Sequence, residues 1–172
     1  GSSELWVSGD GADRSLGNVD VVFPILHGPF GEDGTIQGML ELFGLPYVGS
    51  GVLASSLGMD KHFTKTVLQA AGIEVAPWRT IKRYDWHKRP QAIRAMAEQM
   101  TLPVFIKPAR AGSSVGVGKV SNWDQFAAAM DVAFLEDDHV LIEAGIVGRE
   151  VECAVLQGMP GQPTRASVAG EI

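Results

Sequence analysis

The sequence of 172 residues has very little cysteine and no long apolar run. Its one cysteine, Cys153, excludes an internal disulfide framework and every cysteine-rich zinc site. No stretch approaches the ~20 consecutive apolar residues that a membrane-spanning helix needs. The first residues, GSSELWVSGDG, contain neither the basic nor the apolar segment of a secretory leader. These absences predict a cytoplasmic protein that does not enter the membrane.

Positive charge is also scarce, because 14 Lys and Arg stand against 20 Asp and Glu, a formal net charge of -6. A general nucleic-acid binder needs excess Lys and Arg to replace the counterions of the phosphates, so this balance argues against that class. A local cationic pocket for a small anion remains compatible with it. The length allows one domain or two small ones of ~100–150 residues.

The first third of the sequence alternates between apolar runs and helical patterns that end at glycine. Residues 19–26, VDVVFPIL, predict a buried strand of the parallel-sheet type. A helix over residues 36–43 follows, and Gly44 ends it. The other elements expected here are a short strand at 46–48 and helices at 52–57 and 60–71.

Strands dominate the last third, so the sequence predicts a mixed α/β or α+β fold with a boundary near residue 58. Ser121, followed three residues later by an acid, matches a capping box and begins a helix. In one expected strand Val151, Cys153 and Val155 alternate, which predicts a buried, inert thiol. The expected strands are 73–77, 79–81, 102–106, 115–120, 139–143, 149–157 and 166–172, and the expected helices are 91–100 and 121–134.

The segment FIKPARAGSSVGVGKV (105–120) joins an apolar run to a glycine-rich stretch through Lys107. It fails the spacing of a P-loop and of the dinucleotide fingerprint, but it contains G-x-S-x-G around Ser114. That pattern raises the alternative of a serine hydrolase that uses Ser114 with His139. A nucleophile elbow requires a helix directly after the serine, whereas the alternation in VGVGKV predicts a strand.

The remaining geometry is a hairpin with a small, flexible tip and a lysine where the tip begins. Backbone N–H groups and hydroxyls in such a tip can approach an anion closely, and Lys107 supplies the charge. Lys61 and Lys65 lie four residues apart on an expected helix and therefore share one face. A phosphate chain between this face and the hairpin would turn their repulsion into binding. The alternative is that all three lysines are ordinary solvated side chains.

The segment LIEAGIVGREVE (141–152) predicts a strand that runs into Glu143, Ala144 and Ile146. Such an edge can offer backbone N–H and C=O groups to an adenine ring, with Glu150 placed for ribose hydroxyls. The alternative is a buried strand followed by a solvated turn.

Four segments together resemble the D-alanine–D-alanine ligases of the ATP-grasp superfamily. They are LHGPFGEDGTIQGMLELFGLPYVGSGVLASSLGMDK, LPVFIKPARAGSSVGVGKV, LIEAGIVGREVECAVL and the closing GEI. The resemblance implies an α/β fold of the ATP-grasp type. Residues 1–58 would be the end of a pre-ATP-grasp domain, and residues 59–172 the first, incomplete lobe of the ATP-grasp unit.

The resemblance also implies a reaction, in which ATP activates the carboxylate of one D-alanine as an acyl phosphate. The amine of a second D-alanine would then attack it, for peptidoglycan precursor synthesis. The residues that it implicates are Lys61 and Lys107 as phosphate contacts, Ser113 (the catalytic member) and Ser114 in the loop over the phosphates, Glu143, Ala144 and Ile146 around adenine, Glu150 at the ribose, and His27 with Gly28 at the first D-alanine.

Parts of the family pattern are absent, including the N-terminal strand that holds the substrate amine and everything after GEI. We therefore expect the magnesium ligands to lie outside this chain, and we assign no metal site within it. The resemblance implies a homodimer for the complete protein. It leaves D-alanine, D-lactate or D-serine open as the second substrate, and a nucleotide-binding fragment without activity stays a further alternative.

Overall fold

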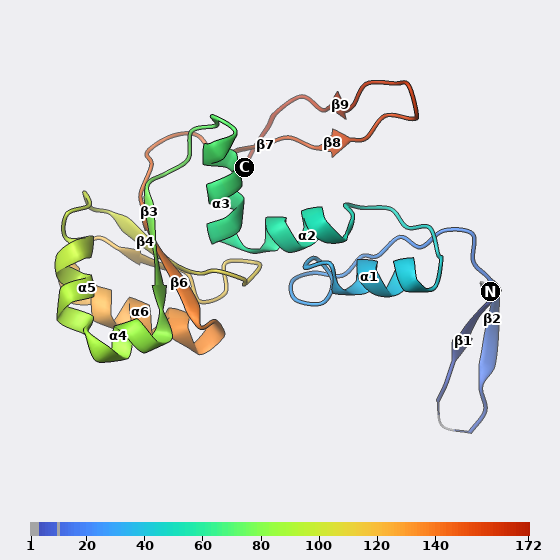
Figure 1. Cartoon of the computed structure of the whole chain (residues 1–172), viewed down its shortest axis with the longest axis horizontal. Coiled ribbons are helices and arrows are strands. Elements are labelled where there is room, and N and C mark those ends of the chain that lie inside the picture. The colour runs from blue at the N-terminus through green and yellow to red at the C-terminus, as the bar shows by residue number, and fades with distance from the viewer. Residues whose placement is uncertain (1–3, 10) are drawn as a thin grey trace.

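The structure, a computed structural model, describes residues 4–9 and 11–172. It is elongated (Figure 1). A lobe built on a sheet forms one end, helices α2 (Val52–Met59) and α3 (Lys61–Ala70) lie in the middle, and α1 (Thr35–Leu42) lies toward the other end. None of the helices among the described residues is long and apolar enough to span a membrane.

The sheet of the lobe has four antiparallel strands in the order β3-β6-β4-β5. Side chains of successive strand residues point to opposite faces. On β4 and β6 the fully buried Val104, Ile106, Val140 and Ile142 belong to the core and therefore share one face. The strands are β3 (Trp78–Lys82), β4 (Val104–Pro108), β5 (Gly118–Val120) and β6 (His139–Ala144).

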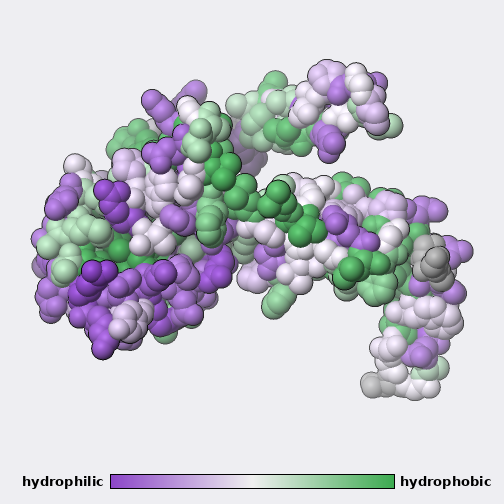
Figure 2. Space-filling view, viewed as in Figure 1, coloured by the Kyte–Doolittle hydropathy of each residue, from purple (hydrophilic) through white to green (hydrophobic). Residues whose placement is uncertain are grey.

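Three helices cover this apolar face and complete the core of the protein. They are α4 (Arg83–Lys88), α5 (Pro90–Ala97) and α6 (Phe126–Glu136), with a short 3-10 turn, η1 (Trp123–Gln125), before α6. Trp86 and Phe126 meet edge-to-face in this core, with their ring centroids 5.9 Å apart. The core lies almost wholly within residues 81–142. Figure 2 shows the contrast with the middle of the molecule, where apolar surface stays exposed, as at Leu53 on α2.

The predicted helices of the first third are confirmed. Asp60 caps α3, because its carboxylate accepts hydrogen bonds from the backbone N–H groups of His62 and Phe63. The N-terminal residues form a two-stranded hairpin of β1 (Glu4–Val7) and β2 (Arg14–Asn18).

The predicted strand at residues 19–26 is wrong over most of its length. The segment pairs through one isolated parallel bridge, between Val22 and Tyr47, and the side chains of Phe23 and Ile25 are exposed. A strand buried on both faces needs neighbours on both sides. Among the described residues the segment has only the short extended stretch around Tyr47 beside it.

Residues 149–157 also depart from the predicted single strand. They divide into β7 (Val151–Glu152), paired with β10 (Gly170–Glu171), and β8 (Val155–Leu156), paired with β9 (Arg165–Ala166). Both pairs are two-stranded and exposed, so no core forms beneath them. Cys153 is therefore exposed, and the prediction of a buried thiol is wrong.

Two local boundaries differ from the prediction, and one helix was not predicted. Asn122, rather than Ser121, caps the turn before α6, in a capping box with Gln125. Residues 73–77 are irregular, although the Pro77 carbonyl accepts a hydrogen bond from the Ala144 N–H and so extends the β3–β6 pairing. The helix that was not predicted is α4, which directly follows β3 and has no clear amphipathic pattern in its six residues.

Candidate functional site

The second face of the sheet carries charge where the first carries the core. Glu143 on β6 stands opposite both Phe105 on β4 and Trp78 on β3. Lys107 lies two residues beyond Phe105, so it points to the same face as Glu143 and is a diagonal neighbour of it. Alternation thus explains why an apolar strand contains a lysine, since residues 105 and 107 turn away from the core.

Glu143 is the centre of a buried ion cluster. Its Oε1 accepts a hydrogen bond from Lys107 Nζ at 2.6 Å, and its Oε2 pairs with Lys65 Nζ at 2.8 Å. The Glu143 side chain is only 12% exposed. Burial raises the pKa of this carboxyl, but the hydrogen bonds from the two lysines outweigh burial and hold the pKa below its ordinary value. Glu143 is therefore an ionised carboxylate shared by two ammonium groups.

Helix α3 lies over this face and brings Lys65 to Glu143. His62, one turn earlier, accepts a hydrogen bond at Nδ1 from the Trp78 indole N–H at 3.2 Å, which joins α3 to β3. Lys65 Nζ also donates to the Ala76 carbonyl at 3.3 Å and lies 5.6 Å from the centre of the Trp78 ring. Lys65 is thus held on several sides.

Lys61, at the start of α3, is bound to backbone carbonyls. Its Nζ donates to the Pro108 carbonyl at 3.0 Å and to the Ala111 carbonyl at 2.7 Å, at the base of the Gly-Ser loop (residues 112–116). Burial lowers the pKa of Lys61, and repulsion from Lys107 lowers it further. An anion placed between these two lysines would relieve that repulsion.

These side chains line one pocket of about 500 Å³ between α3 and the sheet. We call it the lysine pocket. Three ammonium groups and one carboxylate line it, so its charged side chains carry a positive excess of two, which suits an anion such as a phosphate chain. Its lining residues are Gly58, Lys61, Thr64, Lys65, Leu68, Val75, Ala76, Lys107, Glu143 and Ile146.

The Gly-Ser loop is a tight turn beside this pocket. Ser113 and Ser114 are exposed, with φ of 48° and 57°, in the left-handed region that non-glycine residues seldom occupy. The chain after Ser114 turns and then enters β5. A nucleophile elbow needs a helix there, so the hydrolase alternative lacks its defining geometry.

The base of the loop is fixed by Arg110. Its Nε and Nη2 donate to the two carboxylate oxygens of Asp137 at 3.0 and 2.6 Å, and its backbone N–H donates to the same carboxylate. The Asp137 side chain is only 4% exposed. Burial raises the pKa of Asp137, while the Arg110 side chain and the His139 backbone N–H lower it, and the net pKa lies below the ordinary value.

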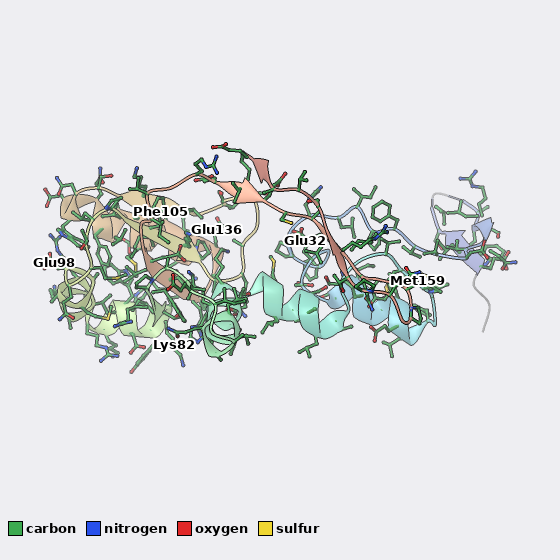
Figure 3. All side chains as sticks on the ribbon, turned by 90° about the horizontal axis from the view of Figure 1, so that it is seen from above. Glu32, Lys82, Glu98, Phe105, Glu136 and Met159 are labelled. Atoms are coloured by element: carbon green, nitrogen blue, oxygen red, sulfur yellow. The ribbon has the colours of Figure 1, made fainter. Side chains whose placement is uncertain are left out.

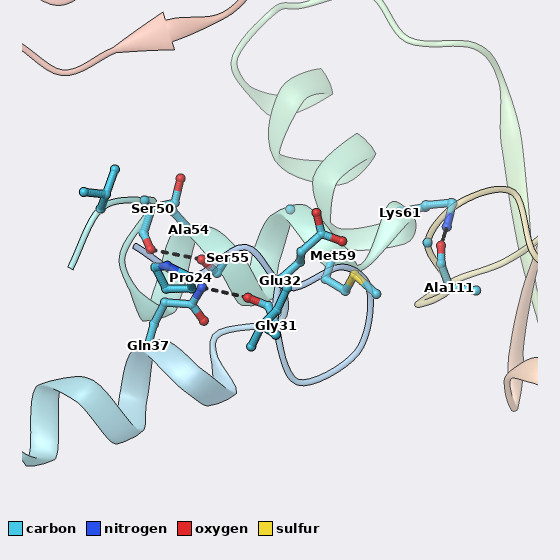
Figure 4. A pocket seen from close by; sticks show the side chains of 15 residues that line it. Pro24, Gly31, Glu32, Gln37, Ser50, Ala54, Ser55, Met59, Lys61 and Ala111 are labelled. Atoms are coloured by element: carbon cyan, nitrogen blue, oxygen red, sulfur yellow. Dashed lines mark hydrogen bonds between the residues drawn. The ribbon is translucent and has the colours of Figure 1, made fainter. Parts of the chain in front are cut away.

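A second cavity, of about 590 Å³, lies between the Gly-Ser loop and the first third of the chain (Figure 4). We call it the Glu32 pocket. Glu32 lines it and accepts the backbone N–H of Gly28, while Lys61 and Gly112 line its other side. A Cβ on Gly112 would lie 3.4 Å from the Gly28 Cα, so this loop and the Gly28 turn are in close contact. Figure 3 shows Glu32 in the half of the molecule away from Phe105 and Glu136.

The structure thus brings together only part of the predicted site. Lys61, Lys107, Glu143 and Ile146 line the lysine pocket. The other candidates lie apart from that lining among the described residues: Ala144 lines a separate hollow beside β3 and α5, His27 and Glu150 are exposed, and Ser113 and Ser114 stand on the neighbouring loop.

Two contributions were missed or undervalued from the sequence. Lys65 was predicted to share a phosphate-facing helix surface with Lys61, but its ion pair with Glu143, 78 positions away, has no signal in the sequence. Glu32 begins no recognised motif in the sequence, although the GED segment after a strand-like run could have indicated a site. No group of three or more His, Cys, Asp or Glu side chains in the described part of the chain could hold a metal ion.

Comparison with known proteins decides the family. The family models for the N-terminus and the C-terminus of D-ala D-ala ligase match residues 3–50 and 67–172. The chain belongs to the D-alanine–D-alanine ligase family. The predicted α/β fold of the ATP-grasp type is confirmed, and the serine hydrolase alternative is not supported.

Relatives and solved structures of this ligase family agree. The D-alanine–D-alanine ligase of Pseudarthrobacter chlorophenolicus is 55% identical over 92% of this chain and 42% of its own length. The structure of the Coxiella burnetii D-alanine–D-alanine ligase covers 97% of this chain and 50% of its own, with 38% identity and a TM-score of 0.83. The structure of the VanG D-Ala:D-Ser ligase of Enterococcus faecalis covers 92% of this chain and 46% of its own, with 41% identity and a TM-score of 0.80. The chain therefore spans about half the length of these relatives.

Proposed function

We propose that the protein containing this chain joins two D-alanines to D-alanyl-D-alanine, with ATP as the energy source, for peptidoglycan precursor synthesis. The lysine pocket carries the proposal, because it places Lys61, Lys107, Glu143 and Ile146 around one cationic hollow. Membership of the D-alanine–D-alanine ligase family and the name of the Pseudarthrobacter relative supply the reaction.

The ATP phosphates occupy the cationic side of the lysine pocket. Lys107 and Lys61 neutralise the oxygens of the phosphates, a role that suits phosphoryl transfer because positioning and charge stabilisation supply most of that catalysis. Ser113 and Ser114 close over the phosphates and exclude water from the activated intermediate. The chain between Glu143 and Ile146 frames the adenine, and Glu150 binds the ribose.

The chemistry has two steps. A carboxylate oxygen of the first D-alanine attacks the γ-phosphorus, the bond to ADP breaks, and an acyl phosphate forms. The amine of the second D-alanine then attacks the acyl carbon, inorganic phosphate leaves, and the amine releases a proton as the peptide bond forms. Lys107 and Lys61 act by charge in the first step, and the loop protects the acyl phosphate until the second.

The first D-alanine lies near His27 and Gly28. Support comes from the contact between Gly28 and Gly112, which brings this turn to the same loop that flanks the phosphates. The second substrate is D-alanine in this proposal. Since the VanG structure is a D-Ala:D-Ser ligase of comparable similarity, D-serine is the alternative to test.

The domain assignment, cellular location and oligomeric state in this proposal are those that the family resemblance implies. We assign residues 1–58 to a pre-ATP-grasp domain and 59–172 to the first ATP-grasp lobe, in a cytoplasmic homodimer. Magnesium accompanies ATP in this proposal, but the described residues do not form a site that fits the ion.

The deciding experiment measures D-alanine-dependent release of ADP from ATP, with magnesium present, and the dipeptide formed. Turnover by this chain supports the proposal directly. ATP binding without turnover supports the alternative of a nucleotide-binding chain that lacks activity by itself. Absence of both ATP binding and turnover contradicts the proposal for these residues. Replacing D-alanine by D-serine as second substrate tests the specificity.

A further inference from the structure

We propose that Lys65 is a positioning residue that frees Lys107 for the nucleotide phosphates by holding Glu143. The inference rests on the proposed function and extends it to Lys65, to which the proposed function gives no role. In the structure Lys107 and Lys65 share the Glu143 carboxylate, one lysine on each oxygen. Each lysine therefore determines how firmly the carboxylate holds the other.

Glu143 takes one of the three N–H donors of Lys107 and holds the ammonium toward itself, so it competes with a phosphate for the position of that charge. Lys107 Nζ lies 2.6 Å from Glu143 Oε1, a short, charge-assisted hydrogen bond. A phosphate that draws this ammonium away removes one partner from a carboxylate that is 12% exposed. Leaving a buried charge unpaired is strongly unfavourable. Lys65 prevents this, because it stays on the other oxygen.

The two lysines are held differently, which assigns them different roles. Lys65 is 15% exposed and has three partners: Glu143, the Ala76 carbonyl and the face of the Trp78 ring. Lys107 is 26% exposed and has Glu143 and the Phe105 ring beside it. Lys65 is thus fixed by the sheet and the segment after α3, whereas Lys107 is the ammonium that can turn toward a ligand.

The test compares the affinities of ATP, ADP and adenosine for the chain by isothermal titration calorimetry. In Lys65→Met, Lys107 is the one cation among the described residues that stays paired with Glu143, which holds it more tightly. We expect ATP and ADP to bind about tenfold more weakly, which is ~1.4 kcal/mol. Adenosine, which has no phosphate, should bind as it does to the wild type. A loss confined to the phosphates distinguishes this role from a general loss of structure.

A double-mutant cycle separates action through Lys107 from direct phosphate contact. If Lys65 acts through Lys107, the Lys65→Met/Lys107→Met variant binds ATP no more weakly than Lys107→Met alone. If the two losses add, Lys65 contacts phosphate itself and the inference is overturned. Lys88→Met is the matched control, because it removes an exposed lysine of α4 that stands over Tyr84. It should leave the affinity for ATP unchanged.

Further variants keep the test decisive if Lys65→Met folds poorly. Lys65→Arg keeps the charge and should bind ATP within about twofold of the wild type, which is ~0.4 kcal/mol. Lys65→Met/Glu143→Gln removes the carboxylate that restrains Lys107, so ATP affinity should recover relative to Lys65→Met. If Lys65→Met binds ATP with the same affinity as the wild type, this inference is overturned and the proposed function is left intact. A wild-type chain that does not bind ATP overturns the assignment of the ATP phosphates to the lysine pocket, and this inference with it.

Discussion

Replacing Asp137 by Asn should destabilise the sheet lobe strongly, although the two side chains have nearly the same shape. The carboxylate accepts hydrogen bonds from the Arg110 backbone N–H, from Arg110 Nε and Nη2, and from the His139 backbone N–H. Every partner is a donor. In Asp137→Asn one oxygen becomes an NH₂ group, which faces donors and cannot bond to them.

The magnitude follows from burial on the two sides of the pair. A hydrogen bond to a charged group contributes ~1.5–3 kcal/mol, and at least two such bonds are lost or weakened. The Asp137 side chain is 4% exposed, so it cannot turn to water, but the Arg110 side chain is 52% exposed and recovers hydration. We therefore expect a loss of ~2–4 kcal/mol in the free energy of unfolding, below the sum of the separate bonds.

Urea unfolding of the chain, followed by tryptophan fluorescence, measures this loss. Asp138→Asn is the matched control, since Asp138 is the next residue and pairs with Arg83 at 2.5 Å, but its side chain is 71% exposed. An exposed pair contributes ~0–1 kcal/mol. If the free energies of unfolding of the Asp137 and Asp138 variants are equal, and both lie within ~1 kcal/mol of the wild type, the reasoning that burial sets the strength of this pair is refuted.

Three further predictions concern the site and its stability. Lys107→Met should raise the apparent KM for ATP and lower kcat in the active protein, because the removed charge acts on the phosphates; steady-state ADP release checks it, and unchanged ATP kinetics would refute it. Gly145→Ala should lower the melting temperature, since its Cβ would lie 2.6 Å from the Pro103 carbonyl oxygen, and thermal unfolding unchanged from the wild type would contradict that clash. The pKa of both Glu143 and Asp137 is lowered in the folded state, so the unfolded chain binds more protons in acid. Their contribution to stability is full above their ordinary pKa values of 4.5 and 3.8 and is lost as pH falls through the lower folded values, which urea titrations from pH 7 to pH 3 should record.

The sequence predicted best those elements whose partners lie close along the chain or within one sheet. Strands β4 and β6 were predicted correctly from their apolar or alternating sequences. Each forms because it finds hydrogen-bonded neighbours among residues 78–144. Residues 19–26 have an equally apolar pattern, yet within the described part of the chain they make only the Val22–Tyr47 bridge. Apolar periodicity reports the preference of a segment, whereas a strand also needs a neighbour to pair with.

The candidate site divides in the same way. Lys107 could be identified as a candidate because a lysine at the end of an apolar strand breaks the local pattern. Lys61 could be identified because it lies four residues from Lys65, on the same helix face. The role of the Glu143 side chain could not be found, since it depends on Lys107, 36 residues away, and Lys65, 78 residues away. Local pattern identified which residues were unusual, and tertiary structure determined what they contact.

The lysine pocket gives a chain of net charge -6 a local surface that suits an anion. Lys61 is satisfied by backbone carbonyls, which disperse its charge without neutralising it. Lys65 and Lys107 share a single carboxylate, which neutralises one charge of the two. The pocket therefore keeps a positive excess that the protein does not cancel internally, and that excess is local because the low dielectric around buried groups preserves it. Net charge argues against a general nucleic-acid binder, but it carries no information about a pocket that three lysines and one carboxylate line.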